Sequence, residues 1–203
     1  MPDPETVYLI DDDPSIRRSL TRLLRTSGYH VQTYADPRQF LEELPDSPLG
    51  CSILGLEMRH LDGLQTQQAL MGQCPSLSVV MLTAHGTVAR SVRAMKNGAV
   101  DVLEKPIDHE VFCSVIETAL IEARKRRQEQ REAQEVTRLL ARLTARENDV
   151  FALIAKGFTN GEAGTLLGIS RDTVKLHRAR VMKKLEADSL ADLVRLYHAA
   201  PVH

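Results

Sequence analysis

Side chains that could form a site for Mg²⁺ and a phosphorylated carboxylate follow short apolar segments of this 203-residue chain. Asp11 and Asp12 follow the first such segment, Thr83 ends a later one, and Lys105 follows the last. Carboxylates bind Mg²⁺, whereas a hydroxyl and a lysine donate hydrogen bonds to phosphate oxygens. If the apolar segments are parallel strands, their carboxyl ends meet at one edge of a sheet, so these four side chains lie close together.

The order of segments between residues 7 and 120 predicts the sheet that this pocket needs. Short apolar segments alternate there with amphipathic ones, and Asp13 and Pro14 form a typical helix start before the first amphipathic segment. Five strands and five helices in strict alternation predict a doubly wound parallel sheet, with Gly55 on the same edge as the pocket. The expected strands cover residues 7–10, 29–34, 51–54, 79–82 and 101–103, and two of the helices cover residues 63–72 and 86–97.

The fifth predicted helix continues far beyond the sheet. It begins near Asp108, and the chain has no Gly or Pro between Ile107 and Gly157. A continuous helix to about residue 140 is roughly 50 Å long at 1.5 Å per residue. Residues 124–135 are almost wholly polar, so this stretch reads as a solvent-bridging rod. A flexible linker is the alternative, which the absence of Gly and Pro disfavours.

The last sixty residues are predicted to form a separate unit of four helices. Thr144 and Glu147 have the spacing of a capping box at the start of the first helix. Ser170 is expected to cap a basic helix that begins at Arg171. Val174, Val181 and Leu185 recur in that helix at spacings that direct them inward. Leu190, Leu193, Val194 and Tyr197 of the last helix are expected to close the core.

Charge divides unevenly between the two halves of the chain. Residues 1–121 hold 10 Lys and Arg against 16 Asp and Glu, whereas residues 122–203 hold 16 against 11. The basic second half therefore favours a polyanionic partner. The three cysteines lack metal-ligand spacing and are expected to be reduced thiols. No apolar run approaches a membrane span, and no signal peptide is evident, so we expect a cytoplasmic protein without a membrane partner.

Several spaced motifs in the second half resemble the LuxR-type helix-turn-helix. They lie at residues 143–147, 155–157, 160–162, 167–170, 173–175, 177 and 184–185. With the alternating first half, nearly the whole chain resembles a response regulator of the NarL/FixJ family, in its long-linker subgroup. The resemblance implies a flavodoxin-like receiver domain over residues 1–121, a linker helix over 122–142 and an all-α DNA-binding domain over 143–203. It also implies that the chain is not an enzyme.

The resemblance gives each residue of the first pocket a role. Asp11 and Asp12 match the acid pair that binds the metal, Thr83 matches the hydroxyl that binds the phosphoryl group, and Lys105 matches the lysine that contacts phosphate. A cis peptide bond is implied before Pro106.

Three departures from the family pattern indicate that phosphate signalling has been lost. Gly55 stands where the family has the aspartate that accepts the phosphoryl group, so no acyl phosphate can form there. Arg59 replaces the proline after Met58, and Val102 replaces the aromatic residue three positions before the lysine. The pocket is therefore interpreted as vestigial, with no cofactor and at most weak Mg²⁺ binding at Asp11 and Asp12.

Some alternatives at the pocket stay open. Glu57 or Asp62 could accept phosphate instead, although each lies on a register different from that of Gly55. Arg59 could pair with Asp11 or Asp12 in the vacated pocket or face solvent. His85 is interpreted as a loop residue rather than a ligand.

The resemblance also implies which side chains meet double-stranded DNA. Lys175 and Leu176 match positions that read base edges, whereas His177 either packs or contacts phosphate. The basic residues around them are expected to contact phosphates, which position the protein without specifying sequence. The predicted DNA-binding set is Arg171, Thr173, Lys175, Leu176, His177, Arg178, Lys183 and Lys184.

We expect a homodimer that binds two half-sites of DNA. A partner protein or a small ligand in the pocket could regulate the protein in place of phosphate. A protein-interaction module that barely touches DNA is the alternative function. Gly161, Ala163 and Gly164 favour that alternative, because they replace better helix formers or bulkier residues of the family in a short helix.

Overall fold

The computed structural model describes residues 5–84 and 88–200, which form two compact units that divide between Gln128 and Glu129. His85 lies outside the described residues. The elements of the first unit are β1 (Thr6–Ile10), α1 (Pro14–Thr26), β2 (His30–Tyr34), α2 (Pro37–Glu43), β3 (Gly50–Gly55), α3 (Gly63–Gln73), β4 (Ser78–Thr83), α4 (Val88–Lys96), β5 (Asp101–Glu104) and α5 (His109–Leu140), which continues into the second unit. The second unit adds α6 (Ala145–Ala155), α7 (Asn160–Leu167), α8 (Arg171–Lys184) and α9 (Leu190–Ala199).

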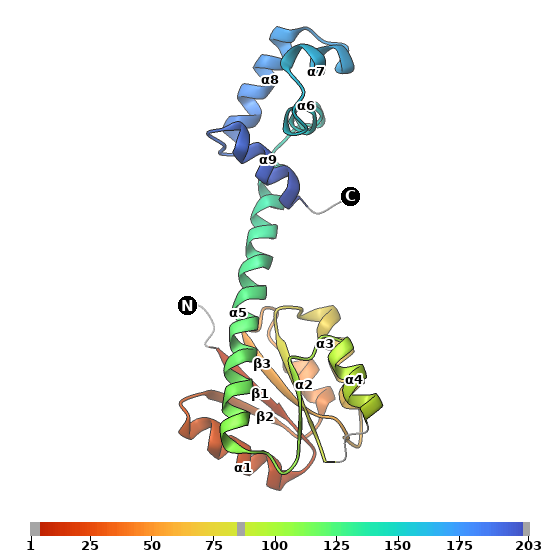
Figure 1. The fold of residues 1–203 in the computed structure, drawn as a ribbon, viewed down its shortest axis with the longest axis vertical. Coiled ribbons are helices and arrows are strands. Elements are labelled where there is room, and N and C mark those ends of the chain that lie inside the picture. The colour runs from red at the N-terminus through yellow and green to blue at the C-terminus, as the bar shows by residue number, and fades with distance from the viewer. Residues whose placement is uncertain (1–4, 85–87, 201–203) are drawn as a thin grey trace. The chain divides into compact units, whose positions relative to one another are not determined.

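The first unit is a five-stranded parallel sheet with the order β2-β1-β3-β4-β5, which confirms the predicted doubly wound fold. The three central strands are buried along their whole length, as expected for strands covered on both faces. Leu24 of α1 and Ile116 of α5 pack on one face, whereas Phe40 of α2, Leu70 of α3 and Ala94 of α4 pack on the other. Figure 1 shows these helices in two layers around the sheet.

The strand register brings the ends of β1, β3 and β4 to one edge of the sheet. Ile10 pairs with Leu54, and Gly55 pairs with Leu82. The start of α3 approaches this edge closely, because a Cβ built on Gly63 would lie 2.3 Å from the carbonyl oxygen of Gly55. Only glycine fits there, so this position fixes the short path from β3 into α3. The peptide bond before Pro106 is cis, as the resemblance implied.

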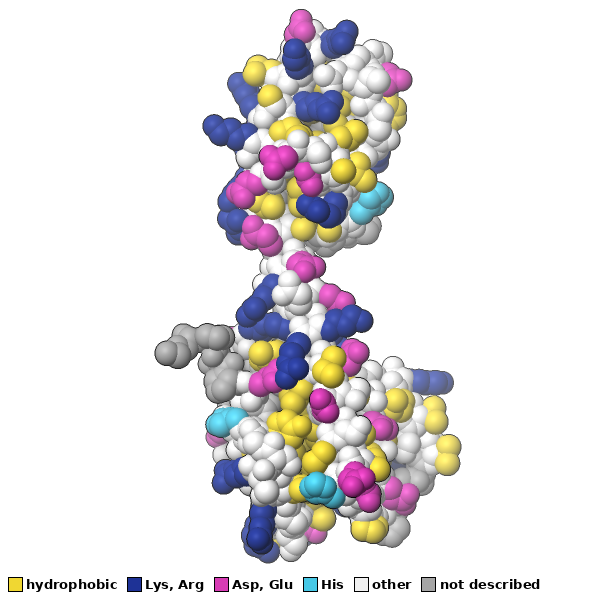
Figure 2. Space-filling model, turned by 60° about the vertical axis from the view of Figure 1, so that its left-hand side comes forward, with side chains coloured by type: hydrophobic (Ala, Val, Ile, Leu, Met, Phe, Trp, Pro, Cys, Tyr) yellow, Lys and Arg dark blue, Asp and Glu magenta, His cyan; other side chains and the backbone are white. Residues whose placement is uncertain are grey.

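Helix α5 is continuous over 32 residues, close to the predicted range. Its residues 122–128 still belong to the first unit: Ala123 is fully buried, and Arg124 pairs with Glu5 at 2.6 Å. Leu139, near the other end, packs in the core of the second unit. Both ends of the predicted linker therefore fold into the flanking units, and charged side chains cover the visible face of its middle stretch (Figure 2).

The second unit consists of helices around one core. Thr144 caps α6 and Ser170 caps α8, as predicted, and Glu147 completes the capping box of α6. Leu193 is fully buried in this core, and Tyr197 packs against it. Leu190 was expected in the core but is 44% exposed, because it lies in the first turn of α9 on the solvent side. Among the described residues, no helix is long and apolar enough to cross a membrane.

Candidate functional site

Gly55 lies at the end of β3, where the pocket would need a phosphate acceptor. A Cβ built on Gly55 would lie 3.2 Å from Oδ2 of Asp11 and 3.2 Å from Cγ of Met58. The space beside Gly55 is therefore lined by a carboxylate and a flexible thioether side chain. A short side chain fits there after a small shift of these two neighbours.

Asp11 forms the buried centre of the pocket. Its side chain is only 2% exposed, and Lys105 Nζ donates to its Oδ2 at 2.5 Å. Its other carboxylate oxygen accepts a hydrogen bond of 2.9 Å from the backbone N–H of Asp13. Both oxygens are thus occupied by donors of this chain, and the buried charge is neutralised, as a buried carboxylate requires.

The hydroxyl of Thr83 donates to the carboxylate of Glu57, which lies in the loop after β3. Thr83 is 2% exposed, and its Oγ1 donates to Glu57, with distances of 3.2 Å to Oε1 and 3.3 Å to Oε2. Glu57 itself is exposed, so the contact joins a buried hydroxyl to a carboxylate at the surface. Sequence reasoning treated Glu57 only as an alternative acceptor and did not foresee this pair.

Arg59 was predicted either to pair with Asp11 or Asp12 or to face solvent, and in the structure it does both. Its Nε lies 3.4 Å from Oδ2 of Asp12, yet the side chain is 84% exposed. The guanidinium therefore pairs with the acid pair at its rim and does not enter the space beside Gly55. A pair this exposed contributes about 0–1 kcal/mol.

The other predicted features of the pocket have structural roles. Asp62 caps α3 through the N–H of Leu64 and pairs with Arg90 at 2.5 Å, so its carboxylate is engaged by α3 and α4. Val102 is partly buried and packs against the core on the α3 side of the sheet.

In the pocket, each of the two carboxylates that would bind Mg²⁺ faces a cation of the same chain. Mg²⁺ requires near-octahedral oxygen ligands, commonly one or two carboxylates together with phosphate oxygens. Here Asp11 faces Lys105 and Asp12 faces Arg59. Within the described part of the chain, no group of three or more His, Cys, Asp and Glu side chains could hold a metal ion.

In the second unit, α8 is held by a tight turn after α7. The cap of α7, Gly168, has a φ of +65°, a conformation that favours glycine. A Cβ on Gly164 would lie 2.7 Å from the carbonyl oxygen of Ile169, so this helical glycine allows the turn to pack closely. Gly164 therefore has a packing role, and it no longer favours a protein-interaction module over a DNA-binding unit.

The predicted DNA-binding side chains divide by exposure. Some of these side chains are exposed on α8 and form no hydrogen bond or ion pair with another side chain of the described residues. Leu176, for example, is 52% exposed. Thr173 instead bonds to the cap residue Ser170, and Arg178 donates to Asn160 at 3.4 Å. His177 is half-buried, and its Nδ1 is buried without a hydrogen-bond partner, which agrees with packing rather than phosphate contact. The exposed members are Arg171, Lys175, Leu176 and Lys183.

Lys184 is engaged within the unit. Its Nζ donates to Oε2 of Glu147 at 2.6 Å, and the Glu147 side chain is 4% exposed. The hydrogen bonds from Lys184 and from the backbone and hydroxyl of Thr144 lower the pKa of Glu147 to about 2. This ion pair competes with the phosphate contact that sequence reasoning gave to Lys184. Nothing in the local sequence signals a pair that is 37 residues apart.

Comparisons with known proteins agree with this architecture. Residues 7–117 match the response regulator receiver domain, and residues 141–197 match the luxR family of bacterial regulatory proteins. The transcriptional regulatory protein FixJ of Bradyrhizobium diazoefficiens is 36% identical over 190 residues, which cover 94% of this chain and 93% of FixJ. The chain belongs to the NarL/FixJ family of response regulators.

Two further relatives support the NarL/FixJ assignment. Nodulation protein W of Bradyrhizobium diazoefficiens is 37% identical over 190 residues, which cover 94% of this chain and 84% of that protein. The solved structure of the response regulator StyR has a TM-score of 0.83 and 36% identity, and the match covers 97% of this chain and 99% of StyR. As a member of this family, the protein is a DNA-binding transcriptional regulator and not an enzyme. Helices α7 and α8 correspond to its LuxR-type helix-turn-helix.

Proposed function

We propose that this response regulator binds DNA without phosphorylation of its receiver domain. The observation that carries the proposal is Gly55, which has no side chain at the end of β3, beside Asp11 and in the strand next to Thr83. Acyl phosphate formation needs a carboxylate in line with the donor and next to a bound metal ion. Glycine supplies no carboxylate, and the neighbouring acids are engaged in other contacts.

The contacts within the pocket support the same proposal. Lys105 binds Asp11, Thr83 binds Glu57, and these contacts use the cation and the hydroxyl that would hold a phosphoryl group. The charges of the pocket are balanced without any ligand. We therefore propose that Mg²⁺ binds weakly or not at all, and that the pocket has one stable state.

DNA affinity measured with and without a phosphodonor tests this function. The full-length protein is titrated against its operator after incubation with acetyl phosphate and Mg²⁺, and in parallel with Mg²⁺ alone. We expect equal affinities, because no phosphorylated state forms. A tenfold change in affinity on addition of acetyl phosphate would overturn the proposal. The operator itself is found by selection from random duplexes, where a LuxR-type dimer should enrich a palindromic motif.

We propose further that the protein binds as a homodimer, in the bacterial cytoplasm. Two half-sites about one helical turn apart match the two-fold symmetry of a dimer of such domains. An exposed apolar stripe on α4 supports self-association: Val88, Val92 and Met95 are 79%, 45% and 46% exposed. Sedimentation of the full-length protein should show a dimer that Val92→Asp shifts toward monomer. A wild-type protein that is monomeric at all concentrations and on DNA contradicts this.

Within α8, we propose that Lys175 and Leu176 read base edges and that Arg171 and Lys183 contact phosphates. Their exposure supports these roles. Lys184 is assigned instead to the ion pair with Glu147, which stabilises the packing of α8 on α6.

A further inference from the structure

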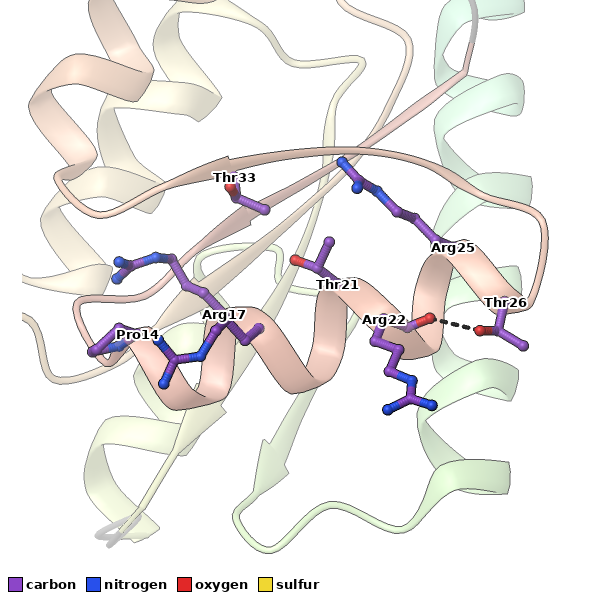
Figure 3. Close-up of a pocket in the computed structure, with 8 residues that line it drawn as sticks. Pro14, Arg17, Thr21, Arg22, Arg25, Thr26 and Thr33 are labelled. Carbon is purple, nitrogen blue, oxygen red and sulfur yellow. Dashed lines mark hydrogen bonds between the residues drawn. The ribbon is translucent and has the colours of Figure 1, made fainter.

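The first unit carries a basic groove that the DNA-binding function does not use. The groove lies between α1 and the edge strand β2 and has a volume of about 750 Å³. Four arginines of α1 line it, together with hydroxyls from both elements (Figure 3). Its volume falls in the range of small-molecule sites, about 300–1,000 Å³. The side chains that line it include Arg17, Arg18, Arg22, Arg25, Thr21 and Thr33.

The concentration of charge on α1 is unusual for this half of the chain. Four of the ten Lys and Arg residues in positions 1–121 lie on this one helix, which contains no Asp or Glu. Among the described residues, none of the four guanidinium groups forms an ion pair with a carboxylate. Arg18, Arg22 and Arg25 follow one another at spacings of four and three residues, so their like charges repel along one face of the helix. An anionic ligand would relieve this repulsion.

A hydrogen bond within the chain holds one arginine of the groove in place before any ligand binds. Arg17 Nη1 donates to the backbone carbonyl of Asp11 at 2.6 Å, which anchors its guanidinium at one end of the groove. Figure 3 shows the hydroxyls of Thr21 and Thr33 between the guanidinium groups of Arg17 and Arg25. These two arginines are eight positions apart, which corresponds to about 12 Å along the helix. The arginines can therefore contact separate anionic groups of one ligand.

The chemistry of the lining selects the ligand class. Guanidinium groups form bidentate hydrogen bonds to phosphate and carboxylate oxygens, and hydroxyls add further donors. The lining contains no carboxylate to bind a cation and no aromatic ring to stack on a base. We propose that this groove binds a small molecule with two or more phosphate groups, recognised through its phosphates. The proposal does not depend on whether Gly55 has ended phosphorylation of the receiver.

Calorimetric titration of the full-length protein with tripolyphosphate at physiological ionic strength tests the site. Binding should weaken at least about tenfold in the double variant Arg22→Gln and Arg25→Gln. The matched control, Arg93→Gln with Lys96→Gln, removes the same charge from α4 of the same unit and should bind like wild type. A second variant, Lys175→Gln with Lys183→Gln, removes exposed charge from the DNA-binding helix α8 and should weaken tripolyphosphate binding less than the α1 variant does.

Three results would overturn the proposal. The first is no binding of tripolyphosphate to the wild-type protein, and the second is equal weakening in the α1 variant and the α4 control, since that reports net charge alone. The third is loss of binding in the α8 variant only, which assigns the anion to the DNA-binding helix. Tighter binding of a poly-glutamate peptide than of tripolyphosphate would assign the groove to an acidic protein segment instead. A urea unfolding transition of the Arg22 and Arg25 variant that matches the wild-type transition confirms that its first unit is folded.

Discussion

The hydroxyl of Thr83 lies 3.2 Å from Oε1 of Glu57, on the side of the pocket where Gly55 leaves no side chain. The Thr83–Glu57 hydrogen bond and the Lys105–Asp11 ion pair are alike in how they use the groups of the pocket. In each, a group that the family resemblance assigns to phosphate or metal binding is satisfied by a residue of the same chain. The polar groups of this pocket are therefore paired within the chain.

Removal of Lys105 should destabilise the receiver unit. Lys105→Ala leaves the Asp11 carboxylate, 2% exposed, without its ionic partner, and a broken buried pair costs about 3–5 kcal/mol. Lys96→Ala, an exposed site on α4, should change the free energy of unfolding by less than about 0.5 kcal/mol. Urea denaturation of the full-length protein measures both. Equal stability of the two variants would show that the Asp11 pair contributes nothing.

The two glycines of α7 should respond to alanine in opposite directions. A Cβ on Gly161 meets only Thr159 Oγ1, at 4.0 Å, so Gly161→Ala should stabilise the second unit by up to about 1 kcal/mol. A Cβ on Gly164 would lie 2.7 Å from the backbone of Ile169, so Gly164→Ala should destabilise it although alanine favours helices. Thermal unfolding followed by circular dichroism compares the two variants. Stabilisation by both changes would contradict the close packing of the turn at Ile169.

The Glu147–Lys184 pair predicts an acid-sensitive DNA-binding unit. The pKa of Glu147 is lowered to about 2 in the folded state from its ordinary value of 4.5. A lowered pKa means that the stabilisation is fully present above about pH 4.5 and is lost as the pH falls toward 2. Glu147→Gln should destabilise the unit by about 1.5–3 kcal/mol at neutral pH and flatten its pH dependence in that window.

Glu162→Gln is the matched control for this prediction. Glu162 occupies the same capping-box position in α7, but it is exposed and its carboxylate accepts hydrogen bonds from Thr159. The effect of its substitution should stay near the value of a helix cap, about 1 kcal/mol. If Glu147→Gln costs no more than Glu162→Gln, the ion pair with Lys184 is not a stabilising contact.

Two exposed lysines of α8 should differ in how they affect operator binding. Lys175→Ala should cost about 1–3 kcal/mol and relax the preference at one base position, because Lys175 is assigned to a base edge. Lys183→Ala should weaken binding to all sequences alike and reduce the salt dependence by about one phosphate contact. Quantitative binding to the selected operator and its single-base variants separates the two outcomes. Identical sequence profiles for both variants would remove the special role of Lys175.

The sequence predicted the fold well because its signals are local and repeated. Strands β1, β3 and β4 are continuous apolar segments, and the caps of α1, α6 and α8 carry their signatures at fixed spacings. Leu190 was misplaced because its spacing fits the inner face of α9, whereas its position in the first turn leaves it at the surface.

The pairs within the candidate sites could not be predicted in the same way. Thr83 and Glu57 are 26 residues apart and Lys184 and Glu147 are 37 apart, and both contacts depend on how the elements pack. Gly164 was interpreted as a weakness of α7, since helix propensity alone disregards the carbonyl of Ile169 that lies against it. The position of Glu57 two residues after Gly55 was a signal in the sequence, and it indicated only that Glu57 lies near the pocket.

Intact-protein mass spectrometry measures directly whether the receiver, with Gly55 at the end of β3, accepts a phosphoryl group. The wild-type protein and Gly55→Asp are each incubated with acetyl phosphate and Mg²⁺. The new carboxylate would lie beside Asp11, where the neighbours of Gly55 need to shift only slightly. We expect no mass increase in the wild-type protein, because Gly55 supplies no carboxylate. In Gly55→Asp we expect the addition of one phosphoryl group that alkali removes. A stoichiometric phosphoryl group on the wild-type protein would contradict the first of these expectations.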